Sequence, residues 1–238
     1  MNEPQILYCD NHLLCVTKPP GVLSQADMTG DLDLLSWCRS YVEKRFNKPG
    51  RAYLGLVHRL DRPASGVMVF ARTSKAAARL SRQFRDRTVA KRYFALVEGR
   101  LTGSGTAVAR IRKSGRGVEE VPNDAAGGME AELFWRSELL LPSTTLVHVD
   151  LSSGRKHQIR FQLSQEHHPI VGDFRYGSTM ELDGRNIALH CYSLALDHPT
   201  RKVRMSWHSR PPASWPLPSD EFEELYLRLV GGVESGIR

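Results

Sequence analysis

The apolar residues of this chain are gathered in short runs, and most of these runs have the length of a strand rather than of a helix. Residues 6–9 and 13–16 flank a polar turn at Asp10 and Asn11, which predicts a β-hairpin. Strands do not alternate regularly with helices, so the pattern predicts an α+β fold with a mainly antiparallel central sheet and flanking helices. Further strands are predicted at residues 53–57, 66–70, 90–98, 106–112, 129–135, 146–151, 187–196 and 202–207.

Helical spacing of apolar residues recurs in four segments. The first begins at Asp31 and ends before Lys48-Pro49-Gly50, and the second is capped by Thr73 or Ser74 and runs to Phe84. The third and fourth cover residues 157–165 and 220–230, with a frayed tail from residue 231, and residues 113–117 and 123–128 are predicted to be mobile loops. Because no stretch resembles a linker or a repeat, residues 1–238 are predicted to form a single domain.

Composition narrows the class of protein. With 41% hydrophobic and 25% charged residues, the 238-residue chain is typical of globular proteins, which excludes a disordered tail or a disulfide-stapled miniprotein. The formal net charge of +7 favours a polyanionic partner. No apolar run approaches the roughly 18 residues of a membrane span. The four cysteines form no C-x-x-C pair and the nine histidines are dispersed, so we expect buried thiols in a reducing compartment and no metal site.

A polar loop at residues 58–65 lies between two predicted strands, where catalytic groups are often found. In this loop Asp61 has an arginine on either side, Arg59 and Arg62, and such neighbours would keep a carboxylate ionised. The alternative is an ordinary turn residue that binds local backbone amides.

Two further segments have both a chemical and a structural interpretation. In the helix at residues 157–165, Arg160 could reach a buried carboxylate, or the charges of the helix could be solvated. In the strand at residues 90–98, an aromatic side chain could stack on a base while Lys91 and Arg92 meet phosphates, or it could pack in the core.

Taken together, these segments resemble the RluA-type pseudouridine synthase family over most of the chain. Pro63-Ala64 departs from the family pattern, but Asp61, Ser65 and Gly66 keep their places. The motifs that carry the resemblance follow one another in the family's order: Lys18-Pro19-Pro20-Gly21, His58-Arg59-Leu60-Asp61 with Ser65-Gly66, Lys91-Arg92-Tyr93 continuing to Gly99, the run GRKHQIRFQL from Gly154 to Leu163, Pro169-Ile170-Val171-Gly172-Asp173 with Tyr176-Gly177, Leu189-His190, and His198-Pro199.

This resemblance implies an enzyme that isomerises uridine to pseudouridine in RNA without a cofactor or metal, in a catalytic cleft across the central sheet. It implies that Asp61 is the nucleophile, that Arg160 pairs with Asp61, and that Tyr93 lines the uracil pocket and can take part in proton removal. Leu163 would form part of the apolar pocket. Arg59 would fill the stack that the flipped uridine leaves.

The resemblance also predicts the partner. The first family-like strand begins at about Ile6, so no S4-type RNA-binding domain is expected, and a stand-alone, cytoplasmic monomer would recognise a compact stem-loop in tRNA or rRNA with its own loops. Two alternatives stay open: a catalytically inactive RNA-binding protein of the same fold, and a hydrolase that uses Ser65, although the chain lacks a nucleophile elbow. The candidate phosphate contacts are Arg62, Arg92, Arg112, Lys113, Arg116 and Arg155.

Overall fold

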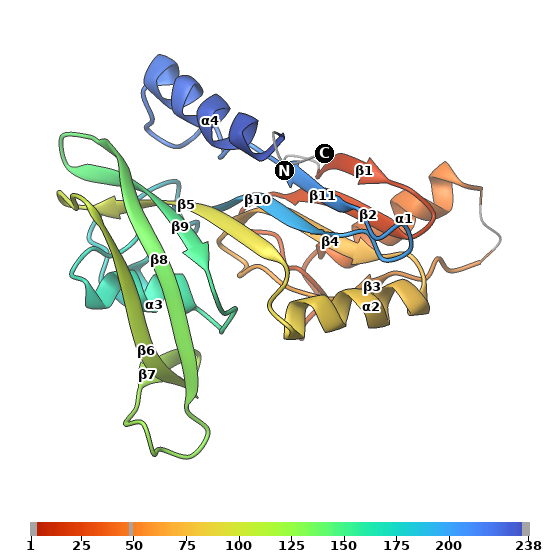
Figure 1. Cartoon of the computed structure of the whole chain (residues 1–238), viewed down its shortest axis with the longest axis horizontal. Coiled ribbons are helices and arrows are strands. Elements are labelled where there is room, and N and C mark those ends of the chain that lie inside the picture. Colours follow the sequence, from red (N-terminus) through yellow and green to blue (C-terminus); the bar gives the residue numbers. More distant parts are fainter. Residues whose placement is uncertain (1–3, 48–49, 235–238) are drawn as a thin grey trace. The chain divides into compact units, whose positions relative to one another are not determined.

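A computed structural model describes residues 4–47 and 50–234, and the chain divides into two compact units (Figure 1). Unit 1 extends to Ala90 and also takes in Cys191–Pro212, whereas unit 2 consists of Lys91–His190 and the chain from Ala213 onward. None of the described helices is long and apolar enough to cross a membrane.

Unit 1 contains a sheet in which the hairpin predicted around Asp10 and Asn11 is confirmed. Strands β1 (Gln5–Cys9) and β2 (Leu13–Lys18) pair antiparallel, and β2 pairs antiparallel with β4 (Ser65–Ala71). The order continues through β10 (Leu189–Asp197) to β11 (Arg204–His208), and the short β3 (Gly55–Leu56) pairs with β4.

Two capped helices belong to unit 1. Helix α1 (Leu34–Arg45) is capped by Asp33, whose carboxylate accepts from the amide of Ser36 at 3.0 Å. Helix α2 (Ser74–Arg85) is capped by Thr73 in the same way, as its sequence predicted. Helix α2 packs on one face of the sheet, because its apolar side chains join a buried cluster with alternate residues of three strands: Ala76 and Leu80 with Leu13, Cys15, Val67, Val69, Leu194 and Leu196.

Unit 2 is built on an antiparallel ladder in the order β5-β9-β8-β6-β7. Its helices are α3 (Gln158–Gln165), the 3₁₀ turn η1 (Phe174–Tyr176) and α4 (Ser219–Glu234). Phe161 of α3 packs against Ile111 and Ala131, with Tyr176 beside them. The strands are β5 (Ala90–Glu98), β6 (Ser104–Ser114), β7 (Gly117–Glu120), β8 (Met129–Leu140) and β9 (Thr144–Leu151).

The α+β prediction is confirmed, but three local predictions were wrong. Residues 113–117 do not form a mobile loop, because β6 and β7 pair around a two-residue turn in which Gly115 has a φ of 51°. The predicted strand at residues 53–57 is reduced to Gly55–Leu56, since the preceding amide of Ala52 binds the carboxylate of Glu43. Helix α4 continues past residue 231 to Glu234, because a glycine costs a helix only about 1 kcal/mol.

Candidate active site

The loop between β3 and β4 presents Asp61 at a tight turn. The carbonyl of Asp61 accepts a hydrogen bond from the amide of Ala64 at 3.1 Å, which places residues 62 and 63 at the centre of the turn. Arg59 is exposed and the Asp61 residue is partly exposed, whereas Leu60 between them is buried. The backbone therefore turns the two polar residues toward solvent while Leu60 anchors the loop.

Lys18 holds this turn from a distant part of the sequence. Its side chain is 0% exposed, and its ammonium donates to the carbonyl of Arg62 at 3.1 Å as well as to those of Pro19 and Val22 at 2.9 and 2.7 Å. Burial lowers the pKa of Lys18 to about 7, and the negative charge of Asp61 opposes this shift. Lys18 thus connects the K-P-P-G segment to the turn that carries Asp61, through a hydrogen bond to Arg62 and through its charge interaction with Asp61.

Other contacts fix the two sides of the loop. The hydroxyl of Ser24 donates to the carbonyl of Leu60 at 2.7 Å and accepts from its amide at 3.2 Å. The guanidinium of Arg62 donates to the carbonyl of Gly21 at 3.0 Å and pairs with the carboxylate of Asp31 at 2.7 Å. Arg62 is therefore engaged with the 21–31 segment.

The strand after the loop begins with an obligatory glycine. Gly66 has a φ of 126°, and a Cβ at this position would lie 2.4 Å from both the backbone nitrogen and the oxygen of Cys191. Only a glycine allows β4 to approach this backbone so closely, and this explains why Ser65-Gly66 follows the Asp61 turn.

In unit 2, Arg160 lies on α3 and is 5% exposed. Its Nε and Nη2 atoms donate to the two carboxylate oxygens of Asp173 at 2.6 and 2.8 Å, and its guanidinium carbon lies 5.1 Å from the centre of the Tyr176 ring. Of the two interpretations of this helix, the buried ion pair is confirmed and solvation of the Arg160 charge is wrong.

The start of α3 explains how this arginine is aimed. His157 has a φ of 52°, and its ring nitrogen Nδ1 lies 2.8 Å from the hydroxyl of Tyr176. The amide side chain of Gln158 accepts from the hydroxyl of Ser153 at 2.8 Å and from the amide of Arg155 at 3.0 Å. These contacts lock the turn from β9 into the helix, so Arg160 emerges in a fixed direction.

The other predicted site residues of unit 2 lie on β5, on α3 and in the turn before α3. Tyr93 is 7% exposed on β5, opposite Val149 of β9, and Leu163 is fully buried on α3. The side chain of Arg155 donates to the carbonyl of Glu130 at 3.1 Å.

The predicted site residues are divided between the units. Asp61, Arg59 and Arg62 belong to unit 1, and Tyr93, Arg160, Leu163 and Arg155 to unit 2, so the pairing of Arg160 with Asp61, the catalytic cleft and the single-domain extent stay predictions. Sequence reasoning missed the roles of Lys18, Ser24 and Asp173. The first and the last stood in quoted motifs, but only their contacts reveal what they hold.

Comparison with solved structures identifies the fold. The structure is similar to two solved human structures, "RNA Pseudouridylate Synthase Domain Containing 4" (TM-score 0.73, covering 94% of this chain and 92% of that chain) and "RNA Pseudouridylate Synthase Domain Containing 1" (TM-score 0.69, 95% and 95%). Both are 22% identical in sequence to this chain. The molecule therefore has the pseudouridine synthase fold.

Sequence similarity identifies the protein family. Residues 12–165 match the family model described as RNA pseudouridylate synthase, and the chain belongs to this family. Ribosomal large subunit pseudouridine synthase D of Pseudomonas aeruginosa is 35% identical over 232 residues, which cover 92% of this chain and 69% of that protein. The protein of the same name from Nitrosomonas europaea is 35% identical over 227 residues, covering 91% and 62%. The predicted activity, isomerisation of uridine to pseudouridine in RNA, is confirmed at the level of the family.

Proposed function

We propose that this isomerase acts on uridine in structured large-subunit ribosomal RNA, with Asp61 as its nucleophile. The observation that carries the proposal is the turn at residues 61–64, which a buried lysine clamps and which leaves the Asp61 residue partly exposed. The names of the relatives favour ribosomal RNA over transfer RNA as the substrate. The expected location in the cytoplasm and the monomeric state stay predictions.

The reaction is an internal transfer that needs no external reagent. The bond from C1′ of the ribose to N1 of uracil breaks, the uracil rotates, a bond from C1′ to C5 forms, the proton on C5 leaves, and N1 takes up a proton in its place. An ionised Asp61 would attack the sugar or the base, or would first remove a sugar proton, and Tyr93 would take part in the removal of the C5 proton. The base must be held in a closed pocket throughout, which requires that it leave the RNA stack.

Arg160 can serve this carboxylate although it already binds another. A guanidinium has five N–H donors, and two of these go to Asp173. As the family resemblance implies, we assign Asp61 a position beside the same guanidinium when substrate is bound. An opposed arginine favours the ionised form that a nucleophile requires.

The remaining residues would bind the RNA. Leu163 would supply an apolar wall of the uracil pocket, and the exposed guanidinium of Arg59 would stack in the space that the flipped base leaves. Arg62 and Arg155 would meet phosphates. Arg62 would do so from its ion pair with Asp31, where its side chain is 45% exposed.

The two alternatives receive less support. Ser65 is 2% exposed within β4, so it is poorly placed as the nucleophile of a hydrolase. An inactive RNA-binding protein would not need a clamped aspartate, an inner tyrosine and a buried arginine together, and all three motifs are intact.

The proposal is tested by the variant Asp61→Asn, which keeps the shape of the side chain and removes its charge. The substrates are unmodified transcripts of large-subunit ribosomal RNA and of a transfer RNA, each carrying 5-tritiated uridine. We expect the wild type to release tritium from the ribosomal transcript, and the variant to release almost none while binding RNA as before.

The control is Asp124→Asn, which changes an exposed loop carboxylate of unit 2 and should retain activity. Near-normal tritium release by Asp61→Asn would show that Asp61 is not the nucleophile. Release by the wild type from the transfer RNA alone would show that ribosomal RNA is not the substrate.

A further inference from the structure

We propose that unit 1 carries a second RNA-binding surface, formed by the outer face of α2 and the turn between β10 and β11, which holds the phosphate backbone of a helical arm next to the target loop. This inference rests on the proposed function, because it names a further part of the same substrate. None of the phosphate contacts predicted from the sequence lies on this surface. The basic residues that form it are Lys75, Arg79, Arg82, Arg85, Arg87, Arg201 and Lys202, all of them exposed.

Helix α2 separates its apolar and its charged side chains sharply. Ala76 and Leu80 are buried in the core of unit 1, whereas Lys75, Arg82 and Arg85 are exposed. Among the residues that the structure describes, these three cations form no ion pair within 4.0 Å. A cluster of unneutralised cations on one face favours an external polyanion.

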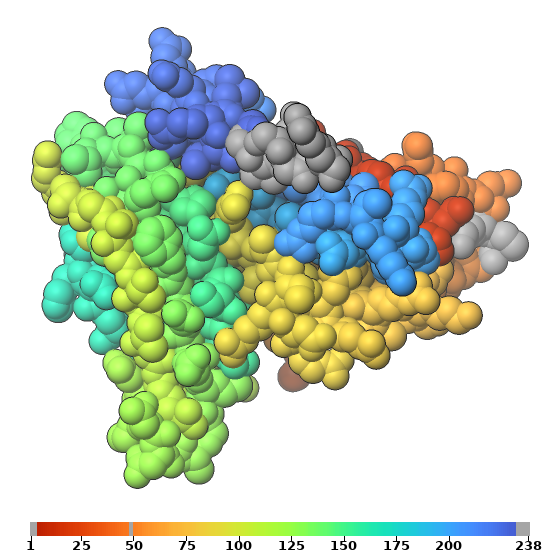
Figure 2. Space-filling view, in the orientation of Figure 1, coloured from red at the N-terminus to blue at the C-terminus, as the bar shows by residue number. Residues whose placement is uncertain are grey.

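The β10–β11 turn adds two more cations beside the helix. Arg79 of α2 donates to the carbonyl of Pro199 at 2.7 Å, and the side-chain amide of Gln83 donates to the carbonyl of Asp197, also at 2.7 Å. Figure 2 shows the two segments together on one face of unit 1, α2 in gold and the turn in blue. Arg201 and Lys202 therefore extend the charged face of α2 rather than forming a separate patch.

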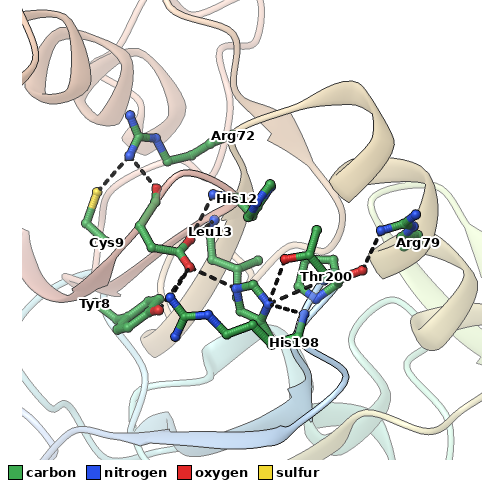
Figure 3. Close-up of polar contacts among 11 residues, drawn as sticks. Tyr8, Cys9, His12, Leu13, Arg72, Arg79, His198 and Thr200 are labelled. Carbon is green, nitrogen blue, oxygen red and sulfur yellow. Dashed lines mark hydrogen bonds and ion pairs between the residues drawn. The ribbon is translucent and has the colours of Figure 1, made fainter.

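A buried histidine shapes this turn (Figure 3). His198 has a side chain that is 0% exposed, and its Nε2 atom lies 2.9 Å from a carboxylate oxygen of Asp10. Its Nδ1 atom accepts from the amides of Thr200 and Arg201 at 3.3 and 3.0 Å, so Nε2 carries the proton that is donated to Asp10. The turn is thus held from inside by His198. The guanidinium of Arg201 also pairs with Asp10 at 3.6 Å, but its side chain remains 60% exposed.

This surface begins at the catalytic loop. The ring of Phe84, in the last turn of α2, stacks on the ring of His58 with 4.7 Å between their centres, and His58 precedes Asp61 by three residues. From Arg85 back to Lys75 the helix rises about 15 Å. That length matches two to three successive phosphates of one RNA strand, so an RNA bound at Asp61 can continue along α2.

The side chains on the exposed face of α2 favour the phosphate backbone of a nucleic acid as the ligand. The exposed positions of α2 carry no aromatic side chain on which a base could stack, so the surface suits a duplex better than an unpaired strand. They also carry no large apolar side chain that could enter a lipid bilayer, because the apolar face of the helix is buried in the core.

The test measures the binding of a mixed-sequence RNA duplex of 20 base pairs by fluorescence anisotropy between 50 and 200 mM salt. The variant Lys75→Gln/Arg82→Gln/Arg85→Gln removes three cations from the surface. The control, Lys44→Gln/Arg45→Gln/Arg51→Gln, removes the same charge from exposed positions in and after the last turn of α1. Because each duplex phosphate contact contributes roughly −0.9 to the slope of log K against log salt, the first variant should lose about 2 to 3 from the magnitude of the slope. The control should lose less than about one.

Activity separates this inference from the proposed function. On the unmodified large-subunit transcript we expect the α2 variant to need a higher RNA concentration, by tenfold or more, but to reach a single-turnover rate within about twofold of the wild type. Equal slopes for the two triple variants, or no duplex binding by the wild type, would overturn the second surface. So would a variant that binds duplex normally but no longer binds vesicles of anionic phospholipid. If the wild type formed no pseudouridine in ribosomal RNA, the proposed substrate would fail, and the duplex measurement would still decide the surface.

Discussion

The guanidinium of Arg160 and the carboxylate of Asp173 meet through two parallel hydrogen bonds inside unit 2, at 2.6 and 2.8 Å. The side chains are 6% and 1% exposed, so water screens this pair very little. The contact joins two sequence motifs, GRKHQIRFQL and PIVGD, through residues 13 positions apart in the chain. It fixes the plane of the guanidinium, and the remaining N–H groups then point in set directions.

Asp173→Asn should destabilise the protein strongly. The change leaves the charge of Arg160 buried without its counter-ion, and breaking a buried pair in this way costs about 3 to 5 kcal/mol. Urea denaturation should show this loss in the free energy of unfolding. The matched control Asp124→Asn changes an exposed carboxylate and should cost less than about 0.5 kcal/mol. Equal stability of the two variants would show that the ion pair does not support the helix.

Replacing Lys18 by Met should lower both stability and its dependence on pH. The carbonyls of Pro19, Val22 and Arg62 would lose a donor, which should cost about 2 kcal/mol at neutral pH. Burial lowers the pKa of Lys18 from 10.5 to about 7, so between these values the folded chain binds fewer protons than the unfolded chain. Below pH 7 the contribution of Lys18 to folding does not change with pH, and between pH 7 and 10.5 it grows as the pH rises.

The pH effect is measured as the difference in unfolding free energy between the wild type and Lys18→Met. We expect this difference to widen from pH 7 to pH 9, by at most about 1.4 kcal/mol per pH unit. The comparison with the variant cancels the titration of other groups. A difference that stays constant over this range would mean that Lys18 remains charged in the folded protein.

Two glycine variants separate backbone strain from steric overlap. Gly103 has a φ of 84° and open space where a Cβ would lie, so Gly103→Ala should cost only about 1 to 2 kcal/mol for its left-handed backbone. Gly66→Ala adds a collision with the backbone of Cys191 at 2.4 Å, and should cost about 3 kcal/mol or more. Thermal unfolding monitored by circular dichroism gives both values, and similar losses at the two positions would contradict the close approach of β4.

The flipping role of Arg59 can be tested by comparing two RNAs that carry the same uridine. If Arg59 fills the vacated stack, Arg59→Ala should lose more activity on a stable stem-loop than on a flexible single strand, because unstacking costs a few kcal/mol. Arg59→Lys should rescue poorly, since an ammonium is not planar. Single-turnover rates on both RNAs decide the matter. Equal losses on the two RNAs, with rescue by Lys, would assign Arg59 a role in holding the loop.

Local signals in the sequence predicted most of the elements correctly. The Thr73 cap, the 90–98 strand and the hairpin around Asp10 all depend on neighbours in the chain, so periodicity and turn chemistry were enough to find them. The first helix shows the limit of this reasoning, because its predicted start at Asp31 was wrong and it begins at Leu34. The structure uses Asp33 as the cap, and Asp31 instead pairs with Arg62 of the loop that carries Asp61.

The sequence by itself determined the α+β class and the order of the motifs, and its family resemblance implied that Asp61 is the nucleophile. Only the tertiary structure decided that Lys18 clamps the turn after Asp61 and that Arg160 binds Asp173. The physical reason is that a strand or a cap is specified by residues a few positions apart, whereas the partner of a buried charge depends on which elements pack together. Burial makes such partners obligatory, but it does not identify them until the packing is known.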